Sequence, residues 1–296
     1  MRAHPLHCLL LAALLAISAG ASHARLQEEQ FDLPVKVVDA YGKPFAQSIK
    51  VTLFFDDANT TPAPVLVLNH GRAAQPADRV KLGRARYPDA AKFFVQRGFI
   101  VAVPTRMGYG VSGGEDVEAS GPCNRKDYPP GFAAAAAQTL AVLEAVRNRP
   151  DAAKDRAVIV GQSYGGATAV ATAAQNPPGV VGAINFAGGS GGNPATQPQQ
   201  PCAPHLLERL YRGYGETARV PMLWLYTEND MYFGPTYPRA WHAAFVAAGG
   251  KAGFVQFPPH GDDGHSLFTR FPSVWQPRVA EFLDGLGFRA QPAKAN

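Results

Sequence analysis

The sequence predicts an α/β fold, with a mostly parallel central sheet that helices cover on both faces. Short apolar segments rich in Val, Ile and Leu alternate with longer segments of helical character, which is typical of parallel sheets buried on both sides. Two long segments rich in Gly and Pro, residues 104–131 and 187–204, interrupt this alternation after predicted strands. Because long loops within a compact domain are usually functional or disordered, we interpret both as the rim of an active site.

Each predicted strand and helix has its own local signal. Apolar, β-branched runs indicate the strands, and residues 41–44 are typical of a hairpin turn between the first two. Gly98 is a good residue to end one helix, and Pro150 closes the long alanine-rich helix. In chain order the expected elements are strands 35–39, 48–55 and 65–68, helix 89–97, strand 99–103, helix 132–148, strands 156–160, 180–186 and 222–226, helix 235–248, strand 254–257 and helix 275–286.

Residues 157–167 predict a strand, a sharp turn and a helix, with Ser163 at the tip of the turn. Glycines flank the serine because the turn is strained and the strand and helix pack closely. The hydroxyl would lie at a helix N-terminus, where backbone N–H groups can stabilise a developing oxyanion. The same G-x-S-x-G spacing surrounds Ser112 and Ser190, but neither has both a strand before it and a helix after it. Ser163 is therefore the predicted nucleophile, and the other two are predicted to be loop serines.

A serine hydroxyl is a poor nucleophile unless a base takes its proton and a carboxylate orients that base. In this architecture the three residues follow strand ends in the order Ser, acid, His. His265 is the predicted base because a glycine precedes it and a helical segment follows, and His260 in the same loop is the alternative. Asp230, at the exit of strand 222–226, is the predicted acid, and Glu228 competes with it.

Two backbone N–H donors should stabilise the oxyanion. One is predicted at Tyr164, the residue after the nucleophile, and the other at Arg72, in the turn after the third predicted strand. Tyr109, Arg106 and Tyr232 lie in rim segments and are predicted to bind substrate. The alternative is that these rings pack the loops and that the arginine is paired structurally.

The loop after the last strand also carries ligand chemistry, because His260, Asp262, Asp263 and His265 occur together. A hydrolase with a bound metal is therefore a rival interpretation. The serine turn has no use for a metal, and the sequence holds no second ligand cluster. We accordingly expect no metal site.

Residues 1–24 are predicted to be a signal peptide. An apolar segment at 8–17 is too short to span a bilayer, and small residues precede a cleavage point after Ala24. An uncleaved anchor is the alternative. The mature chain, residues 25–296, is expected to be one domain with a frayed tail at 291–296, exported to the periplasm or the medium and not inserted in a membrane.

Cysteine content and charge narrow the environment and the partners. Cys8 leaves with the signal peptide, so Cys123 and Cys202 remain, and an even pair in an exported chain predicts a disulfide that ties the rim loops together. Two free thiols are the alternative. The net charge of +5 is scattered and forms no dense basic block, so no nucleic-acid partner is expected. The oligomeric state is left open.

Several of these motifs together resemble the α/β-hydrolase superfamily, and over about residues 35–286 the chain is most similar to exported dienelactone-hydrolase-like esterases. The motifs are His70-Gly71 after a strand, residues 106–114, the serine turn at 161–166, Asp230 and His265. The resemblance implies ester hydrolysis by a Ser-acid-His triad without a cofactor. True dienelactone hydrolases use a cysteine where this chain has Ser163, which favours a general carboxylic ester as substrate.

The expected function is therefore that of a serine carboxylesterase, acting through an acyl-enzyme on a small or medium ester. A serine peptidase or amidase with the same triad is one alternative. A non-catalytic binding protein on a hydrolase scaffold is the other, and a broken triad would be its signature.

Overall fold

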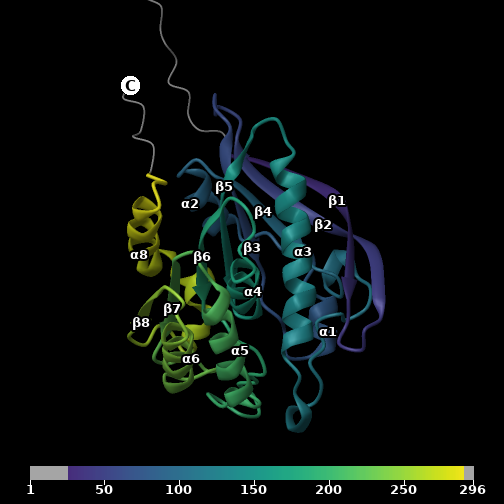
Figure 1. Cartoon of the computed structure of the whole chain (residues 1–296), viewed down its shortest axis with the longest axis vertical. Helices are drawn as coiled ribbons and strands as arrows, with labels where there is room; N and C mark the ends of the chain where they lie inside the picture. The colour runs from purple at the N-terminus through teal and green to yellow at the C-terminus, as the bar shows by residue number, and fades with distance from the viewer. Residues whose placement is uncertain (1–25, 290–296) are drawn as a thin grey trace, which may run out of the picture.

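The computed structural model describes residues 26–289, and it confirms the predicted α/β class. Eight strands form one sheet in the order β1-β2-β4-β3-β5-β6-β7-β8, with helices on both faces (Figure 1). The expected signal peptide and the tail at 291–296 lie outside the described residues. The strands are β1 (Leu26–Val38), β2 (Pro44–Asp56), β3 (Ala63–Asn69), β4 (Ile100–Thr105), β5 (Ala152–Gln162), β6 (Val180–Phe186), β7 (Met222–Thr227) and β8 (Ala252–Phe257).

The sheet is antiparallel at one edge and parallel elsewhere. β1 pairs with β2 and β2 with β4 in antiparallel orientation, whereas all neighbours from β4 to β8 are parallel. The predicted hairpin is present, but β1 begins at Leu26, nine residues before the expected strand at 35–39. Its first half consists mostly of exposed polar residues, so pairing with β2 rather than local apolar content defines it.

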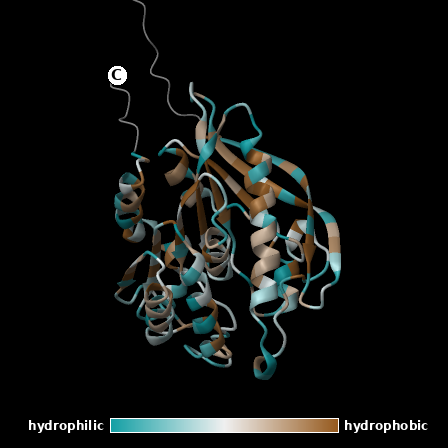
Figure 2. Ribbon diagram, in the orientation of Figure 1, coloured by the Kyte–Doolittle hydropathy of each residue, from teal (hydrophilic) through white to brown (hydrophobic). Residues whose placement is uncertain are grey.

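Two hydrophobic cores lie on opposite faces of the sheet. Alternate residues of β3 show this, because Val65 and Val67 face one core and Leu66 and Leu68 face the other. Helices α3, α4, α5 and α6 cover the first face, and α2, α7 and α8 cover the second. Figure 2 shows the hydrophobic residues concentrated on the central strands. The helices are α1 (Pro76–Val80), α2 (Pro88–Val95), α3 (Pro129–Arg147), α4 (Tyr164–Ala173), α5 (Pro204–Thr217), α6 (Thr236–Ala247), α7 (Leu267–Arg270) and α8 (Pro272–Gly285).

The carboxyl ends of the parallel strands meet at one edge of the sheet, where ligands bind in open α/β folds. The two rim loops leave from this edge, after β4 and after β6. A disulfide between Cys123 and Cys202 joins them across 79 residues, with the two Cα atoms 5.1 Å apart. Within residues 26–289, no helix combines the length and the apolar character that a membrane crossing requires.

Candidate active site

Ser163 occupies a strained turn between β5 and α4. Its φ of 58° and ψ of −123° lie outside the ordinary regions for a residue with a side chain. The turn is held because Ser163 donates its N–H to Phe186 O at 2.8 Å and its carbonyl accepts from Gly166 N at 2.8 Å. A Cβ on Gly161 would come within 2.0 Å of Gly165 O, so strand and helix approach too closely for any larger residue. The predicted strand, turn and helix are therefore all present.

Asp230 and His265 form a hydrogen-bonded pair at the ends of β7 and β8. His265 Nδ1 lies 2.9 Å from Asp230 Oδ2, and the carboxylate is fully buried. Asp230 Oδ1 accepts from the backbone N–H groups of Tyr232 at 2.8 Å and Phe233 at 3.0 Å. Because the carboxylate binds the Nδ1 proton, Nε2 is the ring nitrogen left to act as a base.

The two residues whose N–H groups bind Asp230 also pack their aromatic rings against the imidazole of His265. Tyr232 stacks on His265, with ring centroids 4.1 Å apart and planes inclined by 26°. Phe233 meets the ring edge-on, at 5.2 Å and 77°. Asp263 Oδ1 accepts the backbone N–H of His265 at 2.9 Å, which fixes the loop that carries the ring. The position of the His265 ring is thus fixed by hydrogen bonds at its backbone N–H and its Nδ1 atom and by the packing of two aromatic rings.

The serine turn and the histidine loop are in contact through the residue next to the serine. Gln162 Nε2 donates to His265 O at 3.4 Å. No hydrogen bond between Ser163 Oγ and the His265 ring occurs among residues 26–289.

The competing histidine and acid lie elsewhere, whereas Ser190, one of the two predicted loop serines, lines the same pocket as Ser163. His260 Nδ1 contacts Pro258 O at 2.7 Å, and its ring packs against Phe271. Glu228 is exposed. Ser112 Oγ donates to Thr105 O at 2.5 Å and is not part of the pocket that contains Ser163. In the described part of the chain, no three His, Cys, Asp or Glu side chains are grouped to hold a metal ion.

The two expected oxyanion donors have free N–H groups. Tyr164 is the first residue of α4, so its N–H has no partner within the helix, and neither it nor the Arg72 N–H finds an acceptor among residues 26–289. The turn that carries Arg72 lies against the serine, because a Cβ on Gly71 would meet Ser163 Cβ at 3.1 Å. Both donors and Ser163 line one pocket of about 380 Å³.

The charged side chains that line the pocket are mostly positive. They are Arg72, Arg79, Lys126 and Asp116, and Tyr232 lines the same pocket. Asp116 accepts two hydrogen bonds from Arg72, at 2.7 and 2.5 Å, and one from Arg79 at 2.9 Å. Lys126 Nζ donates to Gly121 O at 2.6 Å, and no carboxylate pairs with it in the described part of the chain. Burial and the nearby charge of Arg72 lower the pKa of Lys126.

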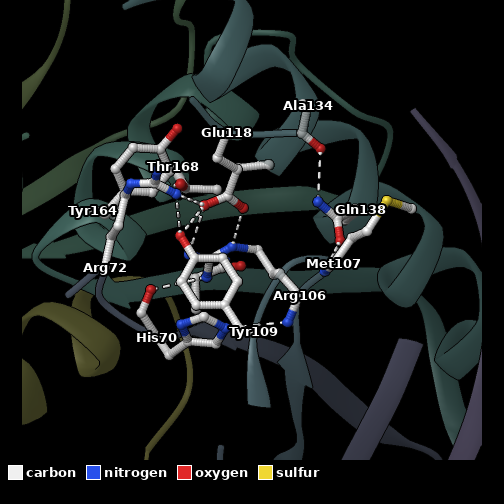
Figure 3. A network of polar contacts seen from close by, with 12 residues as sticks. His70, Arg72, Arg106, Met107, Tyr109, Glu118, Ala134, Gln138, Tyr164 and Thr168 are labelled. Atoms are coloured by element: carbon white, nitrogen blue, oxygen red, sulfur yellow. Dashed lines mark hydrogen bonds and ion pairs between the residues drawn. The ribbon is translucent and has the colours of Figure 1, made fainter. Parts of the chain in front are cut away.

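Arg106 and Tyr109 differ from expectation, because the structure buries them instead of exposing them to substrate. Arg106 is 0% exposed and Tyr109 1% exposed, and neither lines the pocket. Both bind the equally buried Glu118 (Figure 3). Of the three predicted substrate contacts, only Tyr232 lines the pocket. Glu118 and Asp116 are absent from the predicted site, and the only signal for them is an acidic segment that follows Ser112.

Comparison with known proteins gives one family match and many structural ones. Residues 61–231, more than half of the chain, match the family described as Serine aminopeptidase, S33. No curated protein is significantly similar in sequence.

Solved structures share the fold at low sequence identity. A Pyrococcus horikoshii acylaminoacyl peptidase is 15% identical with a TM-score of 0.61, and the match covers 92% of this chain but 43% of the peptidase. A protein from Klebsiella pneumoniae assigned as a dienelactone hydrolase is 17% identical (TM-score 0.53), with 86% and 98% coverage. An esterase from Pyrococcus furiosus is 13% identical (TM-score 0.54), with 86% and 90% coverage. This chain thus spans less than half of the length of the peptidase and nine-tenths or more of the other two proteins.

Proposed function

Because the chain belongs to the serine aminopeptidase S33 family of α/β-hydrolases, we propose that it is a serine carboxylesterase that cleaves small or medium esters. The observation that carries the proposal is the 2.9 Å contact between His265 Nδ1 and Asp230 Oδ2. It lies beside a pocket that contains Ser163 and two free backbone N–H groups. A small molecule is the substrate that a pocket of about 380 Å³ accommodates.

Each group has a defined part in the proposed reaction. Ser163 Oγ attacks the ester carbonyl carbon while His265 Nε2 takes the hydroxyl proton, and Asp230 stabilises the imidazolium that forms. The N–H groups of Tyr164 and Arg72 bind the oxygen of the tetrahedral intermediate. The imidazolium then protonates the leaving alkoxide as its bond to carbon breaks. Water releases the acyl group from the serine by the same steps in reverse.

The charge of the pocket favours an ester over a peptide with a free amino terminus. An ammonium group binds well where a carboxylate is available, but the pocket is lined by the cations Arg72, Arg79 and Lys126. The acid among its described lining residues, Asp116, is already bonded to two of them. A free α-amino group would therefore be repelled. A peptidase that accepts blocked substrates is the second candidate, favoured by the acylaminoacyl peptidase neighbours.

Export is part of the same proposal. The disulfide between Cys123 and Cys202 is the kind of bond that persists in oxidising compartments. We therefore infer that residues 1–24 are removed on the way to the periplasm or the medium, leaving residues 25–296 as one catalytic domain. Protein recovered outside the cytoplasm should begin at Arg25, and recovery of the full chain from the cytoplasm would contradict this.

The test compares Ser163→Ala with Ser112→Ala, a serine in the same G-x-S-x-G spacing outside the pocket. We expect Ser163→Ala to abolish hydrolysis of short p-nitrophenyl esters and labelling by a fluorophosphonate, because both need the nucleophile. Ser112→Ala should retain both. Unchanged turnover in Ser163→Ala would overturn the assignment, and failure of the wild type to label would favour a binding protein. Parallel assays with blocked and free peptide nitroanilides separate the esterase from the peptidase.

A further inference from the structure

A buried ion pair lies beneath the oxyanion-binding turn. Arg106 Nε binds Glu118 Oε1 at 2.6 Å, Arg106 Nη2 binds Glu118 Oε2 at 3.3 Å, and both side chains are fully buried (Figure 3). Removing two charges from water costs several kcal/mol per ion, so a buried pair is weak evidence of a stabilising role by itself. The proposed reaction does not use either group. We infer that the pair positions the Arg72 N–H as an oxyanion donor, an inference that rests on the proposed function.

The first line of contact runs through the main chain. Arg106 donates its backbone N–H to His70 Nε2 at 3.1 Å and its Nη1 to His70 O at 2.8 Å. Because His70 Nε2 accepts this hydrogen bond, the neutral imidazole of His70 must carry its hydrogen on Nδ1. That nitrogen donates to Gly71 O at 2.7 Å. Arg106 therefore fixes both the tautomer and the orientation of His70.

This matters because the carbonyl of Gly71 and the N–H of Arg72 belong to one peptide unit. In a planar trans peptide the C=O and the N–H point in opposite directions. The hydrogen bond that holds Gly71 O against His70 therefore points the Arg72 N–H away from the His70 ring. The turn lies against Ser163, so a rotation of this one peptide plane would withdraw the donor from the reacting oxygen.

The second line of contact holds Arg72 by its side chain. Arg72 Nη1 donates to Tyr109 Oη at 2.8 Å, and Tyr109 Oη donates to Glu118 Oε2 at 2.5 Å. Arg72 is also bound to Asp116 on the pocket wall. Glu118 thus connects the Arg106 guanidinium to the Arg72 guanidinium through Tyr109. Arg72 is therefore held at its side chain by this network and at its backbone by the bond between His70 and Gly71 O.

The second oxyanion donor borders the same groups. The guanidinium carbons of Arg72 and Arg106 lie 5.8 and 5.7 Å from the centre of the Tyr164 ring, within the range of cation–π attraction. Phe132 stacks on that ring at 4.4 Å. Arg106 and Glu118 are therefore positioning residues whose contacts reach the two residues that supply the oxyanion N–H groups.

The test separates positioning from stability. Glu118→Gln and Arg106→Lys each leave part of the network intact, and the double variant Arg106→Met with Glu118→Gln removes both charges. Since an orphaned buried charge is destabilising and a neutral pair is tolerated, the double variant should melt at a higher temperature than Arg106→Met alone. Asp284→Asn is the control outside this network, because it removes one charge of the Arg97–Asp284 pair of 3.1 Å, which joins the turn after α2 to α8.

We expect kcat per fluorophosphonate-titrated site to fall roughly 10- to 100-fold in the positioning variants, less than for loss of a whole oxyanion donor, with little change in KM. Affinity for a trifluoromethyl ketone, whose serine adduct carries an oxyanion, should fall by the same factor. The double variant should regain thermal stability without regaining kcat. Asp284→Asn should keep the wild-type kcat.

Two results would overturn the inference. One is a wild-type kcat per titrated site in Glu118→Gln and Arg106→Lys. The other is recovery of kcat together with melting temperature in the double variant, which would make the pair purely structural. Turnover that survives Ser163→Ala would instead reject the proposed function, so the two failures are distinguishable.

Discussion

Asp230 Oδ2 accepts a hydrogen bond of 2.9 Å from His265 Nδ1, although 35 residues separate the two in sequence. The other carboxylate oxygen is occupied by the N–H groups of Tyr232 and Phe233. One carboxylate oxygen therefore binds the histidine and the other binds the backbone, so the buried carboxylate has little freedom to rotate. This arrangement selects the histidine tautomer with its proton on Nδ1 and leaves Nε2 free to accept a proton.

Asp230→Asn should lower kcat by about 10⁴ at neutral pH with little change in KM, because an amide that donates to Nδ1 favours the wrong tautomer. Steady-state hydrolysis of a p-nitrophenyl ester measures both constants. The control is Glu228→Gln, since Glu228 leaves the same strand but is exposed. Wild-type kcat in Asp230→Asn, or an equal loss in Glu228→Gln, would move the acid away from Asp230.

Tyr232→Ala should reduce kcat/KM for esters by roughly 3- to 10-fold, the value of one aromatic contact. The ring stacks on His265 at 4.1 Å and lines the pocket, so its loss loosens the imidazole and removes apolar contact with substrate. Tyr232→Phe keeps the ring and should keep the activity. Tyr237→Ala serves as control, because Tyr237 stacks on Trp241 outside the pocket. Equal losses in Tyr232→Phe and Tyr232→Ala would assign the effect to the hydroxyl.

Much of the fold and of the proposed triad could be predicted because the relevant signals are local. Apolar runs mark the parallel strands, and glycines around Ser163 mark a turn that tolerates no larger neighbour. Asp230 and His265 could be paired in advance because β7 and β8 are adjacent parallel strands, whose ends meet at one edge. The exit of strand 222–226 then favoured Asp230, and the glycine before His265 with the helical segment after it favoured that histidine over His260.

Helix α5 is absent from the predicted elements, although its buried residues, Leu207, Tyr211 and Gly215, recur at every fourth position as on one face of an amphipathic helix. Other parts depend on contacts that local sequence does not record. Glu118 lies in an acidic segment typical of an exposed loop. Its burial depends on Arg106, which leaves β4 beneath the pocket, and that pairing also withdraws Arg106 from the expected contact with substrate.

Replacing both Cys123 and Cys202 by Ser should lower the free energy of unfolding by up to about 4 kcal/mol, because the bond closes a loop of 79 residues. KM should also rise. Cys202 lines the pocket and accepts a hydrogen bond of 2.5 Å from Tyr128 Oη through its carbonyl, so freeing the loop disturbs the wall. Urea unfolding and ester kinetics measure the two effects.

A reductant supplies the control for the disulfide. It should shift the urea midpoint of the wild type towards that of the double serine variant and leave the variant unchanged. A wild type that is insensitive to reductant under unfolding conditions would show that the thiols are not bonded in the isolated protein.

The free energy of unfolding of the wild type should decrease as the pH falls, because folding keeps His70 neutral. Burial, followed by the charge of Arg106, holds the pKa of His70 well below its ordinary value. An unfolded histidine takes up a proton near pH 6.5, but the folded ring stays neutral, so the unfolded state binds more protons as the pH falls and the free energy of unfolding decreases. This contribution is about 1.4 kcal/mol per pH unit once the unfolded ring is protonated.

The variant His70→Gln can keep a hydrogen-bond donor and an acceptor without titrating. Urea unfolding between pH 7.5 and 5 should therefore show the free energy of unfolding of the wild type falling towards that of His70→Gln as the pH falls. Parallel curves for the two proteins would mean that the folded ring accepts a proton in spite of its contacts with Arg106 and Gly71.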